Sequence, residues 1–286
     1  MNILDFLLIV NMSDTILRGI ESQPDSSKEK NRAERPTLTA YVLRHGETEK
    51  DKTKKDRGLT EKGEREILEA ADRIISELDP QNDIIQLLDS DTPRTKTCNQ
   101  LIGQKLAEAG FKFFTLIRTD KAGKPLETEI NTSGDIVASR RFPKIRMPKI
   151  SEADSAVQRD SSQRKKYNIP NGVEDARMAI WYAMGERGKL SGDSETPQAV
   201  AERMEDGIEQ TKKKLPMLNK LLKPGQRIVA IINANAPQID ALITKKTGKS
   251  MLERGEVKNA KGFRIDFSTL EDSSHKVKAT FEEWPS

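Results

Sequence analysis

The sequence contains few of the cysteine and histidine residues that form disulfides and metal sites. Its 286 residues include one cysteine, Cys98, and two histidines. A single cysteine excludes an intramolecular disulfide and a cysteine-rich metal site, and two separated histidines disfavour a zinc site. We therefore expect no cofactor and no metal, and the chain is compatible with a reducing, cytoplasmic location.

Aromatic residues make up only 5% of the chain, which argues against a nucleic-acid platform on which bases stack. The 49 basic and 45 acidic residues nearly cancel, and a net charge of +4 is too small to indicate DNA binding. The apolar run Ile3 to Val10 is too short to cross a bilayer. We expect neither a nucleic-acid partner nor a membrane partner.

The chain divides into an amino-terminal extension and one domain with an insert. Residues 1–36 are polar after the first apolar run, and we expect them to be disordered, with Met12 as an alternative start. Residues 37–286 form the expected domain. Within it, residues 119–192 are charged and rich in proline, and only Val173 to Met184 suggests a helix.

The first part of the domain alternates between strand and helix patterns. Ala40 to Leu43 is a short buried strand, and Thr60 is a suitable N-cap for a helix that ends at Asp79-Pro80. A second strand over 84–88, a helix over 93–109 and a strand over 113–117 follow. This order predicts a mostly parallel sheet with helices on both faces.

The carboxyl-terminal part continues the pattern. A helix from Thr196-Pro197, a strand over Arg227 to Asn233 and a helix over Pro237 to Thr247 are followed by alternating strands over 263–267 and 276–281. We predict an α/β fold: a three-layer α/β/α sandwich with a mostly parallel central sheet, an inserted segment and a C-terminal β-hairpin.

The most informative stretch is the end of the first strand, where Arg44-His45-Gly46 follows the apolar run. Arginine is well shaped for bidentate binding of phosphate, and a neutral imidazole aimed at phosphorus is a competent nucleophile. The second strand ends near Ser90 and Arg94, at the same edge of a parallel sheet. We therefore predict a phosphate pocket at this edge.

Five ordered pieces of the sequence resemble the motifs of the histidine phosphatase superfamily, the phosphoglycerate mutase-like fold. They are Arg44–Thr48, Asp56–Gly63, Asp89–Thr97, Gly192–Thr196 with its following helix, and Asn235–Leu242. The resemblance extends from about Thr39 to Trp284. One position departs from the family pattern, because Asn235 stands where the second catalytic histidine is expected.

The resemblance implies a two-step mechanism in which His45 attacks phosphorus and forms a phosphohistidine that water then hydrolyses. Arg44 and Arg94 bind the phosphoryl group, and Asn235 takes the place of a stabilising histidine without its positive charge. We expect the remaining substrate contacts at Gly46, Thr48, Ser90 and Ala236. His275, the second histidine, follows a polar turn, and we expect it to be exposed.

The resemblance also implies a proton donor for the leaving oxygen, just beyond the third strand in a Leu-x-Glu context. Leu126–Glu129 is the nearest match, so Glu129 or Glu127 is the candidate, with Glu174 and Asp175 as alternatives. In the resembled family the insert forms a lid over the site. Its basic residues suit either a polyanionic substrate or a solvated surface.

Three functions remain open at this stage. The first is a phosphomonoester hydrolase weakened by Asn235. The second is a pseudophosphatase that binds a phosphorylated small molecule or a phosphoprotein without turning it over. The third is a phosphomutase, for which the insert offers no matching lid residues.

Overall fold

The computed structural model describes residues 38–49, 57–90, 92–115, 129–131, 140–141, 147–160, 162–170, 175–219, 222–269 and 277–285. The expected disordered extension over 1–36 lies outside these residues. So do the acid candidates Glu127 and Glu174, and the second histidine, His275.

The described strands form one sheet in the order β4-β3-β2-β6-β1-β7-β8, with β5 paired to β2. The four central strands β3, β2, β6 and β1 run parallel to one another. Their bounds are Lys112–Thr115 for β3, Asp83–Asp89 for β2, Arg227–Ala234 for β6 and Leu38–Arg44 for β1. The mostly parallel centre of the predicted sheet is therefore confirmed.

Antiparallel strands extend both sides of this centre. β7 (Gly262–Thr269) pairs with β1, and β8 (Val277–Trp284) pairs with β7 to form the C-terminal hairpin. On the other side, β4 (Glu129–Asn131) pairs with β3, while β5 (Arg140–Arg141) lies parallel to the end of β2. The sequence analysis did not predict β4 and β5, which are only three and two residues long.

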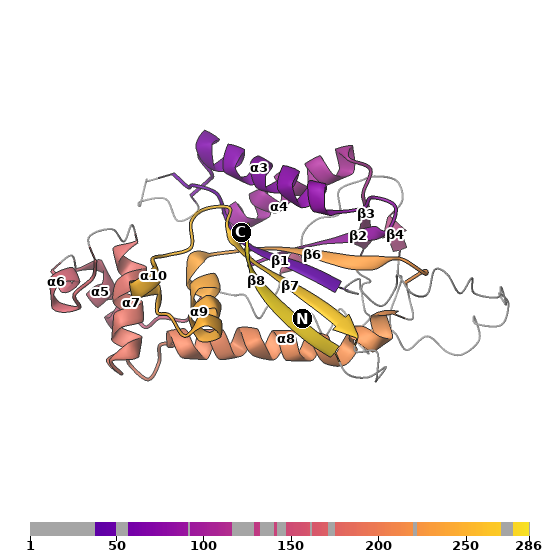
Figure 1. Ribbon diagram of the computed structural model, residues 1–286. Helices are drawn as coiled ribbons and strands as arrows, with labels where there is room; N and C mark the ends of the chain where they lie inside the picture. Colours follow the sequence, from indigo (N-terminus) through magenta and orange to yellow (C-terminus); the bar gives the residue numbers. More distant parts are fainter. Residues whose placement is uncertain are drawn as a thin grey trace, which may run out of the picture.

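Helices cover both faces of the sheet, as Figure 1 shows, and complete the three layers that the sequence predicts. α3 (Glu61–Glu77) and α4 (Pro93–Glu108) pack on one face, where Ile67, Ile74 and Ile102 are fully buried. α8 (Pro197–Asn219) and α9 (Ala236–Thr247) pack on the other face, through residues such as Ile239 and Leu242. The sheet thus separates two apolar cores.

Helix boundaries follow the capping signals of the sequence. The Thr60 side chain accepts a hydrogen bond of 3.0 Å from the Gly63 N–H and starts α3 where predicted. α9 ends at Gly248, whose φ of 70° is a left-handed conformation that glycine adopts without a steric cost. No helix within the described ranges is long and apolar enough to cross a membrane.

The insert contains more helical structure than the sequence predicts. Besides α7 (Ala176–Glu186), it includes α5 (Glu152–Arg159) and the short α6 (Gln163–Lys166). Together with α10 (Met251–Arg254) these helices lie at one end of the sheet (Figure 1). The expectation of a single helix in this segment is therefore wrong. α5 gives no apolar period in the sequence because its two buried residues, Asp154 and Gln158, are polar.

α7, the helix that the sequence did predict, is buried along most of its length. Every residue from Met178 to Met184 is buried, so the helix has no polar face and no amphipathic period. These residues form a third core with Val200, Ala236 and Met251, which belong to α8, α9 and α10. α7 is therefore a central part of this third core.

A buried polar network joins four strands at the amino end of the parallel sheet. Arg227 donates hydrogen bonds of 2.7 and 2.9 Å from Nε and Nη2 to the two carboxylate oxygens of Asp83. Its Nη1 donates to Thr39 Oγ1 at 3.1 Å, and the Thr39 hydroxyl donates to Asp266 at 2.6 Å. The charged pair is almost completely removed from water.

We predict that Asp83→Ala lowers the free energy of unfolding by about 3–5 kcal/mol, because it leaves Arg227 buried without its counter-ion. Asp72→Ala is the matched control, since Asp72 forms a largely exposed pair with Lys105. Loss of such a surface pair costs about 0–1 kcal/mol. Urea denaturation of both variants measures the difference, and equal losses would contradict a stabilising role of the buried pair.

Candidate functional site

The residues that directly follow β1, β2 and β6 lie at one edge of the sheet. The His45 N–H donates to the Ala234 carbonyl at 3.1 Å, and the Ser90 N–H donates to the Asn233 carbonyl at 3.2 Å. These bonds continue the β1–β6 and β2–β6 pairing beyond the strands. His45, Ser90 and Asn235 therefore meet at the carboxyl edge, where open parallel sheets bind ligands.

Asn235 is the residue that connects the two sides of this edge. Its Oδ1 accepts hydrogen bonds from Arg94 Nε at 2.8 Å and Nη2 at 2.6 Å. Its Nδ2 donates to Ser90 Oγ at 2.8 Å. Arginine only donates, so Oδ1 must face the guanidinium and Nδ2 the hydroxyl. Both Asn235 and Ser90 are buried.

The His45 ring is oriented by the backbone of the next residue. Nδ1 lies 2.7 Å from the Gly46 carbonyl oxygen in a buried contact. A carbonyl only accepts hydrogen bonds, so Nδ1 carries the proton and Nε2 keeps its lone pair. The structure thus holds His45 in the tautomer that a nucleophilic Nε2 requires.

The surroundings of His45 keep it uncharged. Burial, then the positive charge of Arg94, lower its pKa to about 3, while the hydrogen bond to Gly46 acts in the opposite direction. Arg44 and Arg57 add smaller contributions that also lower the pKa. At neutral pH the imidazole is therefore a free base, which is the form that can attack phosphorus.

Arg57 is a site residue that the sequence analysis did not assign. Thr48 and Leu59 form an antiparallel bridge, and the Glu49 N–H donates to the Gly58 carbonyl at 3.1 Å. This pairing returns the chain to the residues that follow His45. The Arg57 charge accordingly lowers the pKa of both His45 and Arg94. The available signal was its place in the Asp56–Gly63 piece of the resemblance, just before the Thr60 cap.

Arg44 directly precedes His45, and its side chain is held by contacts with Val257 and Glu256. Its Nη1 donates a hydrogen bond to the Val257 carbonyl and lies 3.4 Å from Glu256 Oε1. The arginine and the glutamate are both largely buried. A carboxylate therefore balances the charge of Arg44, an arrangement for which the sequence offered no indication.

Gly46 packs against the start of α3. A Cβ added to Gly46 would lie 2.1 Å from the Gly63 carbonyl oxygen, and one added to Gly63 would lie 2.1 Å from the Glu47 carbonyl oxygen. Two glycines thus let the loop after His45 contact the helix backbone directly. The substrate contacts expected at Gly46, at Thr48 and at Ala236, the first residue of α9, remain predictions.

The two acid candidates among the described residues, Glu129 and Asp175, lie in different parts of the fold. Glu129 lies in β4 opposite Thr115, at the carboxyl end of β3. The Asp175 carboxylate accepts hydrogen bonds from the Arg177 and Met178 N–H groups and caps α7. Its charge also acts on Arg94, so Asp175 lies on the side of α7 near the site. The identity of the acid remains a prediction.

The Gly192–Thr196 motif joins the insert to the sheet domain. Glu195 pairs with Arg203 of α8 at 3.0 Å, and its carboxylate also accepts a hydrogen bond from the Lys149 N–H at 2.8 Å. The Glu195 carbonyl accepts a bond of 2.9 Å from the Trp181 indole N–H. This part of the resemblance therefore corresponds to contacts that hold α7 against α8.

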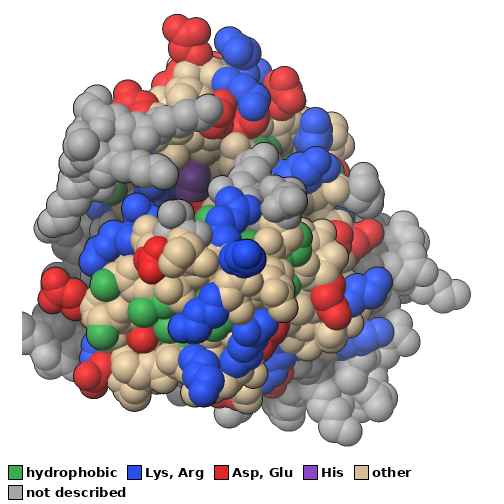
Figure 2. Space-filling model, turned by 90° about the vertical axis from the view of Figure 1, so that its left-hand side faces the viewer, with side chains coloured by type: hydrophobic (Ala, Val, Ile, Leu, Met, Phe, Trp, Pro, Cys, Tyr) green, Lys and Arg blue, Asp and Glu red, His purple; other side chains and the backbone are tan. Residues whose placement is uncertain are grey.

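Figure 2 shows the face of the molecule onto which the site opens. A histidine side chain, drawn in purple, lies in a hollow, and lysine and arginine side chains gather on the surface beside it. His45 is the one histidine among the described residues. Within the same residues no group of three or more histidine, cysteine, aspartate or glutamate side chains could hold a metal ion.

No protein-family model matches the sequence, and no curated protein matches it. Among solved structures, a mycobacterial glucosyl-3-phosphoglycerate phosphatase is 14% identical, with 87% of this chain and 98% of that chain covered at a TM-score of 0.46. A phosphoglycerate mutase from Bacillus anthracis is 16% identical, with 85% and 91% covered at 0.45. Bacillus stearothermophilus YhfR is 11% identical, with 85% and 95% covered at 0.48. Similarity at this level assigns no function to the chain.

We predict that the His45 ring does not titrate between about pH 8 and 4, because its pKa is lowered from 6.5 to about 3. Proton NMR of the two histidine rings tests this, with His45→Asn assigning the signals. An unfolded histidine takes up a proton near pH 6.5, so the unfolded state binds more protons below that value. His45 therefore reduces the stability of the fold as the pH falls from 6.5 to 3. A His45 signal that titrates near pH 6–7 would contradict the buried, neutral state.

Proposed function

We propose that this protein is a phosphomonoester hydrolase of the histidine phosphatase superfamily that acts through a phosphohistidine on His45. One observation carries the proposal: a buried histidine, whose Nδ1 lies against the Gly46 carbonyl, stands within reach of arginine charges at the carboxyl edge of the sheet. The Gly46 carbonyl sets the tautomer, and burial with Arg94 keeps the ring uncharged. Both conditions favour nucleophilic attack.

The first step forms a bond between His45 Nε2 and phosphorus and breaks the bond between phosphorus and the ester oxygen. Arg94 and Arg44 orient the phosphoryl group and stabilise the charge on its oxygens. The departing alkoxide takes a proton from a carboxylic acid, for which Glu129, Glu127, Glu174 and Asp175 are the candidates. In the second step water attacks the phosphohistidine and gives a proton to the same carboxylate. The bond between phosphorus and Nε2 breaks, which releases phosphate and restores the neutral imidazole.

Asn235 is expected to slow both steps. In place of a second histidine it offers one amide, which donates to Ser90 and accepts from Arg94. An amide carries no positive charge, and a phosphate oxygen must share the Arg94 donors with Oδ1 of Asn235. Loss of one stabilising donor in a transition state costs on the order of 10²- to 10³-fold in rate.

The same contact supports a second candidate function. Asn235 has hydrogen-bond partners on both sides of its amide, because Arg94 donates to Oδ1 and Nδ2 donates to Ser90. A pseudophosphatase that binds a phosphorylated small molecule or phosphoprotein, without efficient turnover, would have this arrangement. The phosphomutase hypothesis has no comparable support within the described residues.

We predict slow turnover of p-nitrophenyl phosphate by the wild-type protein and none by His45→Ala. Asn235→His should raise the rate by on the order of 10²-fold, because it restores a donor that can carry charge. Asn82→His is the matched control at the opposite edge of the sheet, beside β2, and should leave the rate unchanged. The release of p-nitrophenolate measures all four proteins.

The four rates separate the candidate functions. Turnover by the wild type that His45→Ala abolishes supports the hydrolase. Activity in Asn235→His alone supports the pseudophosphatase. Activity that survives His45→Ala would contradict a histidine nucleophile.

A further inference from the structure

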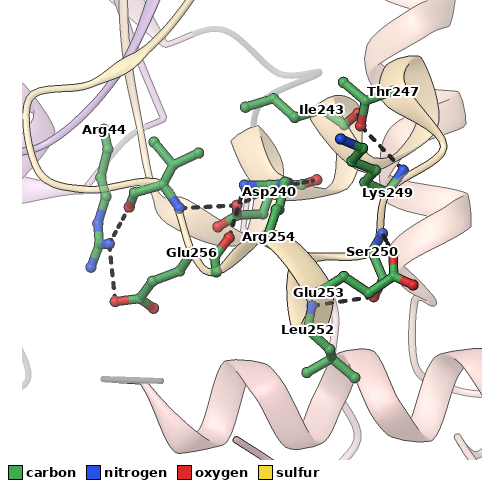
Figure 3. A network of polar contacts seen from close by, with 12 residues as sticks. Arg44, Asp240, Ile243, Thr247, Lys249, Ser250, Leu252, Glu253, Arg254 and Glu256 are labelled. Carbon is green, nitrogen blue, oxygen red and sulfur yellow. Dashed lines mark hydrogen bonds and ion pairs between the residues drawn. The ribbon is translucent and has the colours of Figure 1, made fainter. Parts of the chain in front are cut away.

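The segment between α10 and β7 is fastened to α9 by a buried carboxylate. Arg254 Nη2 donates to Oδ1 of Asp240, and to its carbonyl oxygen at 3.2 Å. The Val257 N–H donates to the same Oδ1 at 3.1 Å. Asp240 is completely buried, and α9, to which it belongs, starts directly after Asn235. Residues 254–257 are therefore tied to the helix that leads from the site (Figure 3).

The other side of this segment faces Arg44. As Figure 3 shows, the guanidinium points to Glu256, which directly precedes Val257 in sequence. Val257 presents its carbonyl to Arg44 Nη1, and the Glu256 carboxylate lies 3.4 Å from the same nitrogen. With side chains only 14% and 8% exposed, Arg44 and Glu256 are shielded from water, which strengthens their attraction. One end of the guanidinium is thus held by the protein itself.

Arg44, the arginine held in this way, belongs to the site through its position and its charge. Arg44 directly precedes His45, and its charge acts on both His45 and Arg94. A flexible arginine loses rotamer freedom when it binds an anion, and this loss weakens binding. An arginine that the protein has already oriented avoids much of that loss.

We propose that Glu256 is a positioning residue that orients Arg44 for binding of the phosphoryl group beside His45. The proposal rests on the proposed function, because it takes this edge of the sheet as the anion site. In this role Glu256 acts on the anion through Arg44 and does not contact the anion itself. Its effect on binding must therefore disappear when the Arg44 guanidinium is removed.

A double-mutant cycle on the full chain tests this dependence. Binding of inorganic phosphate is measured by calorimetry for the wild type, Glu256→Gln, Arg44→Gln and the double variant. We expect Glu256→Gln to weaken binding by about tenfold, the cost of ordering one long side chain. In the Arg44→Gln background the same substitution should change the affinity less than about twofold. Glu253→Gln is the matched control, because Glu253 caps α10 at Ser250 and should leave affinity unchanged.

Three results would overturn the proposal. Equal losses in both backgrounds would show that Glu256 acts through the fold and not through Arg44. Unchanged binding by Glu256→Gln would show that the carboxylate does not orient Arg44 for the anion, and tighter binding would show that it competes with the anion. A wild-type protein that does not bind phosphate at millimolar concentration would remove the anion site.

The test does not depend on turnover. If phosphate binds and the cycle shows coupling while Asn235→His is inactive, only the hydrolase proposal fails. Urea midpoints establish that each variant is folded. If Glu256→Gln does not fold, Glu256→Asp takes its place, because it keeps the charge and withdraws the carboxylate from Arg44. It should weaken phosphate binding only when Arg44 is present.

Discussion

The parallel pairing of β1 with β6 is the constraint on which the site depends. Seven residue pairs, from Leu38 with Ile228 to Arg44 with Ala234, hold the two strands in register. The hydrogen bond from the His45 N–H to the Ala234 carbonyl extends this register by one residue. A shift by one residue would turn every side chain of β1 to the opposite face. His45 and Asn235 therefore meet only in this pairing.

The two arginines of the resemblance differ in how their charges are balanced. Arg44 faces the carboxylate of Glu256, whereas Arg94 hydrogen-bonds the neutral amide of Asn235. The Asn235 amide thus satisfies the geometry of Arg94 without cancelling its charge. Together with Arg57 this leaves a positive field around a neutral imidazole, which suits an anionic ligand. In the proposed function, Asn235 therefore allows anion binding but stabilises the transition state less well than a histidine would.

The helices of the insert share one apolar core with α8, α9 and α10. Trp181 and Tyr182 are buried with a T-shaped contact between their rings, and Glu195 joins the insert to α8. Asp175 places the start of α7 on the side of Arg94. The insert is therefore attached to the sheet domain by specific polar contacts as well as by apolar packing. Its expected role as a lid remains a prediction.

The sequence by itself determined the order of the main strands and helices outside the insert, the start of α3 at Thr60 and the position of His45 after a buried strand. These features depend on neighbours within one or two turns of chain, where capping and periodicity operate. Only the tertiary structure decided the all-round burial of α7, the Asn235 bridge to Arg94 and the pairing of Arg44 with Glu256. Arg94 and Asn235 are 141 residues apart. No local pattern indicates such a contact, because it exists only once parallel strands bring their ends to one edge.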